Sequence, residues 1–231
     1  DAVVLTRSSS KMIQALPLLT SGAADARGLT TEQLALACAS HQGAPIHVER
    51  VNRWLADLGL GDDDLCCGPQ VSRDTDLKIE MIRAHESPCR VHNNCSGKHA
   101  GFLTLTQHLG AGPNYVDPDH AVQKACLEAF ETVTDQTSPG FGIDGCSAPN
   151  FATTMHGMAR AMAWFATAGQ RSDSMSNAGA RLVEAMHTHP ELVAGEGRAC
   201  TRLMRVAKEP VALKTGAEGY FIAILPKQGL G

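Results

Sequence analysis

The segments that resemble β-strands lie at the two ends of the sequence, and those that resemble helices lie between them. Residues 1–6 (DAVVLT) form a β-prone apolar run, and residues 210–216 and 219–226 form two more, separated by a short turn typical of a hairpin. Strands and helices that stay separate along a chain are typical of α+β proteins. The order therefore predicts an antiparallel sheet built from both ends of the chain, with helices packed on it.

The central part of the sequence carries apolar residues at helical spacing. Segment 7–24 begins with serines that can cap a helix and places Met12, Ile13 and Leu16 on one face. Segment 74–86 likewise places Ile79 and Ile82 on an inward face. We expect one domain over residues 1–231, and, because three strands are few for so many helices, further residues beyond both ends. The other predicted helices are 32–41, 47–60, 97–109, 118–134, 150–168 and 175–189.

Composition and charge exclude several classes of protein. The formal charge of −4 comes from scattered rather than clustered residues, so we expect no nucleic-acid partner. The longest apolar stretch, 155–168, is interrupted by His, Gly and Arg and is too short to cross a bilayer. The first residues do not resemble a secretory or transit leader, so we expect none. The eight cysteines lack the spacing of a small disulfide-rich domain. These observations predict a cytoplasmic protein with no membrane partner.

Two short motifs could together carry acyl-transfer chemistry. Ser8-x-x-Lys11 at a helix start puts a hydroxyl and an amine on one side of the helix, where a neutral lysine could activate the serine. By itself the motif is more often a solvated helix start. Lys214-Thr215-Gly216 on a predicted strand strengthens the interpretation, because β-lactamases and penicillin-binding proteins combine these two motifs. The S-x-N element of those enzymes has no convincing counterpart here.

A third group of residues could bind a metal. Cys95-x-x-Lys98 and Cys146 offer two soft thiolate ligands and an amine. Three other interpretations remain open: a lysine that lowers the pKa of a cysteine, a cysteine that is only buried, or a Cys95–Cys146 pair. His41 and His47 flank a loop, and we interpret both as solvated.

Blocks of sequence along the whole chain resemble the asparaginase II family of rhizobial-type L-asparaginases. The most specific are TRSSSKMIQALP, HNNCSGKHAGFL, GIDGCSAPNFATTMHGMARAMAWFA and KTGAEGYFIAILP. The resemblance implies a fold similar to the serine β-lactamases and glutaminases, a homodimer, and hydrolysis of L-asparagine to L-aspartate and ammonia. It implies these site residues: Ser8, Lys11, Ser40 and Lys214 as catalytic groups; Cys95, Lys98 and Cys146 as ligands of a zinc ion (Zn²⁺); and Arg7, His99 and Asp144 as substrate-binding neighbours.

Two other functions compete with this hypothesis. A penicillin-recognising enzyme would use the same serine and lysine motifs on β-lactams, and the missing S-x-N element argues against it. A non-catalytic module stabilised by zinc would use the cysteines for structure and Ser8 as a helix cap, and it would turn over no amide.

Overall fold

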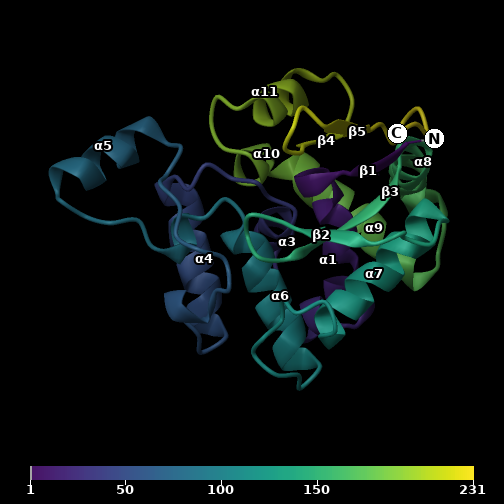
Figure 1. Cartoon of the computed structure of the whole chain (residues 1–231). Coiled ribbons are helices and arrows are strands. Elements are labelled where there is room, and N and C mark those ends of the chain that lie inside the picture. Colours follow the sequence, from purple (N-terminus) through teal and green to yellow (C-terminus); the bar gives the residue numbers. More distant parts are fainter. Residues whose placement is uncertain (1) are drawn as a thin grey trace.

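The computed structural model describes residues 2–231 and contains helices, a three-stranded sheet and a separate hairpin (Figure 1). The α+β class predicted from the order of segments is confirmed. The helices are α1 (Lys11–Thr20), α2 (Ala23–Ala26), α3 (Thr31–Ala37), α4 (Pro45–Asp57), α5 (Thr75–Arg83), α6 (Ser96–His108), α7 (Ala121–Thr134), α8 (Met155–Ala166), α9 (Ser174–Thr188), α10 (Pro190–Val193) and α11 (Ala199–Val206). The strands are β1 (Val3–Leu5), β2 (Phe141–Ile143), β3 (Pro149–Thr154), β4 (Ala212–Thr215) and β5 (Phe221–Ile224).

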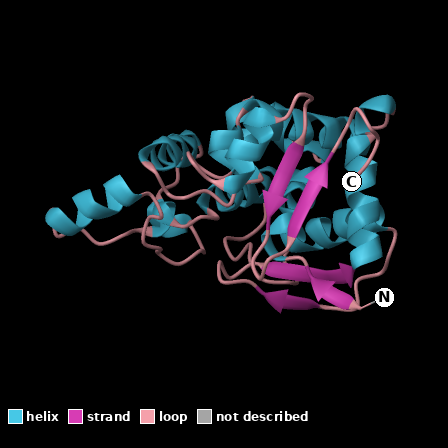
Figure 2. Ribbon diagram, turned by 90° about the horizontal axis from the view of Figure 1, so that it is seen from above, coloured by secondary structure: helices cyan, strands magenta, loops and turns pink. Residues whose placement is uncertain are grey.

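The two ends of the chain do not share one hydrogen-bonded sheet. β1 pairs antiparallel with β3, and β3 pairs antiparallel with β2, in the order β1-β3-β2. β4 and β5 form the predicted hairpin as a sheet of their own. Figure 2 shows these two groups of strands running in different directions. The prediction of one sheet from both ends was therefore wrong, because the partner of β1 comes from the middle of the chain.

That central strand lies in a segment for which the sequence predicted a helix. Residues 149–154 are extended and pair on both sides, and the helix α8 begins only at Met155. Thr154 ends the strand and caps the helix, because its Oγ1 accepts a hydrogen bond from Gly157 N at 3.0 Å. Pairing with two neighbours keeps residues 149–154 extended. Met158 and Met162, whose spacing is helical, lie in α8 as predicted.

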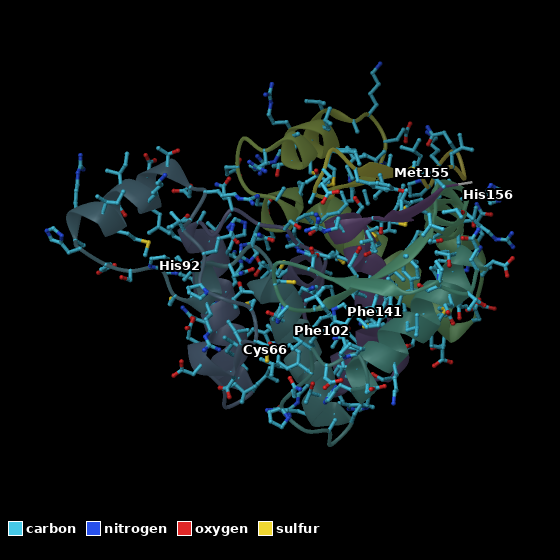
Figure 3. The ribbon with its side chains drawn as sticks, in the orientation of Figure 1. Cys66, His92, Phe102, Phe141, Met155 and His156 are labelled. Atoms are coloured by element: carbon cyan, nitrogen blue, oxygen red, sulfur yellow. The ribbon has the colours of Figure 1, made fainter. Side chains whose placement is uncertain are left out.

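The hydrophobic core is centred on α1. Residues Lys11 to Leu19 are all buried, and the helix packs against α6, α7 and α9 (Figure 1). The predicted inward residues Met12, Ile13 and Leu16 are fully buried. Figure 3 places Phe102 of α6 within the same body. A helix buried along almost its whole length holds its first residue in a fixed position, and that residue is a lysine.

The helix α5 projects from the body on an extended arm (Figure 1). His92 lies where the chain returns from the arm to the body (Figure 3). Of the residues in α5 only Met81 is buried, whereas Ile79 and Ile82 are 40% and 64% exposed. The prediction that both isoleucines face a core was wrong, because the helix has no neighbour on that side. Among residues 2–231, no helix is long and apolar enough to span a membrane.

Candidate active site

One cavity brings together most of the site residues predicted from the sequence. Its volume is about 340 Å³, and Arg7, Ser8, Ser40 and Asp144 line it together with the sulfur-bearing residues Cys95 and Cys146. The other four predicted residues are buried side chains: Lys11, Lys98, His99 and Lys214. The remaining lining residues are Gln70, Arg73, Asn93, Asn94, Gly145, Arg198, Thr215, Gly216 and Ala217.

A single hydroxyl bridges the two buried lysines. Lys11 Nζ donates to Ser40 Oγ at 2.8 Å, and Lys214 Nζ donates to the same oxygen at 2.9 Å. Lys11 also donates to Ala39 O at 2.5 Å and to Cys95 Sγ at 3.1 Å. Ser40 therefore connects the amine at the start of α1 with the amine on β4.

Lys214 loses its proton more easily than an exposed lysine does. Lys214 is 1% exposed, and burial together with the positive charge of Lys11 lowers its pKa to about 7. Thiolates at Cys200, Cys95 and Cys38 would act in the opposite direction. Near neutral pH Lys214 is thus divided between its charged and neutral forms, and the neutral form can accept a proton.

The predicted nucleophile, Ser8, lies in a short 3₁₀ helix (Arg7–Ser10) that runs into α1. A 3₁₀ helix has three residues per turn, so the side chains of Ser8 and Lys11 lie on one side. Among residues 2–231, however, the hydrogen bonds of Lys11 go to Ser40, Ala39 and Cys95, and none goes to Ser8. Ser8 faces the open cavity instead.

Arg7, the residue before Ser8, has a backbone φ of 54°, which is uncommon for a residue with a side chain. Asn150 on β3 holds this conformation: its Oδ1 accepts from Arg7 N, and its Nδ2 donates to Arg7 O, both at 3.1 Å. The Arg7 side chain donates to Asp144 Oδ1 at 2.7 Å and pairs with Glu218. A strained backbone fixed from two sides presents Ser8 at a defined angle.

The glycine of the Lys214-Thr215-Gly216 motif allows β4 to approach this turn. A Cβ at Gly216 would lie 2.7 Å from Thr6 O and 2.8 Å from Ser9 Oγ. Ser9 Oγ also donates to Lys214 O at 3.4 Å. Gly216 is therefore required for the contact that brings Lys214 beside the start of α1.

The loop before α6 places Cys95 in the same cavity as Cys146. Lys98 Nζ donates to Cys146 Sγ at 3.2 Å. A hydrogen bond from the Cys95 thiol lowers the pKa of Cys146, burial opposes this shift, and the charge of Lys98 adds to it. The same hydrogen bond and burial raise the pKa of Cys95. Burial acts to lower the pKa of Lys98, but the charges at the two sulfurs raise it.

His99 is fully buried beside these sulfurs. Cys66 N donates to Tyr115 Oη at 2.7 Å, so the Tyr115 hydroxyl is free to donate to His99 Nδ1 at 2.9 Å. This network assigns the ring proton to Nε2. His99 Nε2 is buried and makes no hydrogen bond to the described residues, and burial lowers the pKa of the ring, which keeps it neutral.

The donor types of this group fit a zinc ion. Two sulfurs and an amine nitrogen meet at one place, and zinc takes sulfur and nitrogen ligands. In the described chain no three His, Cys, Asp or Glu side chains form a metal cluster. Lys98 would therefore have to be the third ligand, and it would have to lose its proton.

Comparison with protein families decides the identity. The family model described as L-asparaginase II matches residues 1–231. The chain belongs to this family. Comparison with curated proteins gives no match. Membership of the L-asparaginase II family implies an amidohydrolase of the asparaginase type acting on a small molecule, and the resemblance stated from the sequence is confirmed.

Several residues of the cavity were missed by sequence reasoning. Gln70 Oε1 accepts from Asn94 N and Nδ2 at 3.1 and 2.8 Å, and Asn93 Oδ1 accepts from Cys95 N at 2.9 Å. These amides hold the cysteine loop in shape. The density of polar residues in HNNCSGKHAG was visible in the sequence, but the partner of Asn94 lies 24 positions away.

The interpretation of two histidines was wrong. His41 and His47 are fully buried and stacked, with ring centroids 4.7 Å apart. Gly43 N donates to His41 Nδ1 at 3.1 Å, and His47 Nε2 lies 2.9 Å from Glu191 O. The two histidines therefore pack away from solvent and support the loop that carries Ser40.

Proposed function

We propose that this member of the L-asparaginase II family hydrolyses L-asparagine to L-aspartate and ammonia through a serine acyl-enzyme. The observation that carries the proposal is the bridge Lys11–Ser40–Lys214 beside a cavity that Ser8 lines. A cavity of about 340 Å³ accommodates an amino acid, and its lining is polar. Family membership supplies the asparaginase-type reaction.

The bridge supports a route for the proton that leaves the nucleophile. Lys11 in its ammonium form passes a proton through the Ser40 hydroxyl to neutral Lys214, which leaves Lys11 neutral. Lys11 then takes the proton of Ser8 while Ser8 Oγ bonds to the side-chain amide carbon of asparagine. Backbone N–H groups at the helix start stabilise the oxyanion, as free amides at such positions do.

Collapse of the tetrahedral intermediate breaks the carbon–nitrogen bond. The leaving nitrogen takes the proton held by Lys11 and departs as ammonia. Water then attacks the aspartyl ester of Ser8 and gives a proton to Lys11. When the ester bond breaks, Lys11 returns this proton to the Ser8 oxygen, and aspartate is released. Each proton removed from a nucleophile is thus returned to a leaving group.

Ser40 is a second candidate for the nucleophile. Ser40 accepts hydrogen bonds from both lysines, whereas Ser8 has none from them among the described residues. Ser40 also lines the cavity. In that version Lys214 is the base, because its pKa of about 7 suits proton acceptance near neutral pH. The chemistry after attack is the same.

A zinc ion held by Cys95, Lys98 and Cys146 would supply a positive charge that orients polar groups of the substrate. Cys95 and Lys98 would each release a proton on binding, so affinity for the metal rises with pH. In the absence of metal, the Lys98 ammonium stabilises the Cys146 thiolate in the same place.

Covalent labelling of the nucleophile distinguishes Ser8 from Ser40. A diazoketone analogue of asparagine alkylates the nucleophile, and mass spectrometry of the digested protein locates the label. We expect the label on Ser8, and loss of ammonia release by at least about a hundredfold in Ser8→Ala. Label on Ser40 would support the second candidate, and turnover of a fluorescent penicillin in place of asparagine would favour the β-lactam alternative.

Substrate preference, the role of the metal, cellular location and oligomeric state remain expectations. Ammonia release from asparagine and glutamine, with and without added zinc, gives the substrate preference and the role of the metal. The eight free cysteines support a cytoplasmic location, where thiols stay reduced. The homodimer implied by the family resemblance is tested by light scattering of the purified protein.

A further inference from the structure

The cavity carries more positive charge than its carboxylate neutralises. Arg7, Arg73 and Arg198 all line it, whereas Asp144 is the acidic lining residue. Arg7 is already paired with Asp144 and Glu218. Among residues 2–231, the guanidinium groups of Arg73 and Arg198 make no hydrogen bond and no ion pair. The cavity therefore favours a ligand that brings its own negative charge.

Of Arg73 and Arg198, Arg198 lines a further hollow together with Ser40. A second hollow of about 290 Å³ adjoins the main cavity, and the residues common to both linings are Ser40, Arg198 and Thr215. Arg198 thus lies at the boundary of the two spaces, on the same wall as the serine that bridges the lysines. Arg73 borders the main cavity alone.

The backbone that carries Arg198 is fixed to the Ser40 loop. Ser40 N donates to Val193 O at 2.9 Å. Gly195 has a φ of 118°, and a Cβ there would lie 2.5 Å from the side chain of Gln42, so this loop fits closely against the residue that follows His41. Thr201 Oγ1 donates to Gly195 O at 2.6 Å, which ties the loop to α11. Arg198 is consequently presented from a rigid support.

We propose that Arg198 binds the α-carboxylate of the amino-acid substrate and is a specificity-determining residue of this site. The inference rests on the proposed function. Two carbons separate the carboxylate of asparagine from its side-chain amide carbon, so the group that holds the carboxylate must lie close to the nucleophile. The guanidinium offers paired N–H donors that match a carboxylate, and it cannot lose its charge.

The test compares two amides that differ in this group. Asparagine carries the α-carboxylate, and 3-aminopropanamide lacks it. In Arg198→Met, we expect kcat/KM for asparagine to fall about 10- to 100-fold, mainly through KM, because a charge-assisted hydrogen bond in the ground state is lost. The value for 3-aminopropanamide should change by less than about twofold. Arg202→Met is the matched control, because Arg202 is an exposed arginine of α11, the helix that Arg198 immediately precedes.

An equal loss for both amides, or no loss for either, would overturn the proposal. A selective loss in Arg73→Met with none in Arg198→Met would assign the role to Arg73 and would also overturn it. A binding measurement separates this inference from the proposed reaction: aspartate should bind wild type more tightly than 3-aminopropanoate, and Arg198→Met should abolish the difference. If the wild type releases no ammonia but binds aspartate more tightly than 3-aminopropanoate, the proposed reaction is wrong and the carboxylate subsite stands. Equal binding of the two acids to wild type would overturn the subsite.

Discussion

The pKa of Lys214 predicts a pH profile that depends on one buried amine. With a pKa of about 7, about one-eleventh of Lys214 is neutral at pH 6 and about ten-elevenths at pH 8. If neutral Lys214 accepts the proton that passes through Ser40, kcat/KM rises about tenfold over this interval and levels off above it. The sign follows from burial and from the charge of Lys11, both of which disfavour the ammonium form.

The assay is ammonia release from asparagine between pH 5.5 and 9, with wild type, Lys214→Met and Lys208→Met. We expect Lys214→Met to lower kcat by about 10²- to 10⁴-fold and to lose the rise centred near pH 7. Lys208 is exposed, so its variant should keep the wild-type profile. A wild-type rate that is flat from pH 6 to 8, or a Lys214→Met variant with an unchanged midpoint, would refute the reasoning.

Three further predictions concern the supports of the site and its metal. Asn150→Ala removes both hydrogen bonds that hold the backbone of Arg7; kcat should fall at least tenfold by the ammonia assay, whereas the exposed Asn177→Ala should match wild type. Thr104→Val leaves the Trp54 Nε1 proton, which now donates to Thr104 Oγ1 at 3.0 Å, without an acceptor; the free energy of unfolding in urea should fall by about 1–3 kcal/mol, and an unchanged midpoint would contradict the burial argument. Chelation of zinc should raise KM for asparagine while kcat changes less, and added zinc should restore it; an unchanged KM would reject the positioning role.

Local sequence features predicted local structure well. The buried face of α1 follows from the spacing of Met12, Ile13 and Leu16, and the hairpin β4–β5 follows from two β-prone runs and a short turn. The predictions were wrong where contacts with residues distant in the sequence determine the local structure. Residues 149–154 became a strand because β1 and β2 pair with them. Ile79 and Ile82 stayed exposed because, among the described residues, the buried contact of α5 is made through Met81.

In the candidate site, too, residue types were predictable from the sequence but their long-range contacts were not. The motifs containing Ser8 and Lys214 were recognisable by their residue types, and family resemblance added Ser40. Spacing gave no indication that Ser40 accepts hydrogen bonds from both lysines, because Lys214 lies 174 positions beyond it. Asn150 was missed for a similar reason: its bonds to Arg7 span 143 positions. Contacts of this length depend on the finished topology and leave no periodic signal.

The hydrogen bonds that join β4 to the start of α1 also determine when the enzyme becomes active during synthesis. Ser9 and Lys214 are 205 positions apart in the chain, so Lys214 reaches the start of α1 only after β4 has left the ribosome. A nascent chain can pack α1, α6, α7 and α9 earlier, since those helices precede the hairpin. A chain that ends before β4 would lack Lys214 and, on the proposed mechanism, would be inactive.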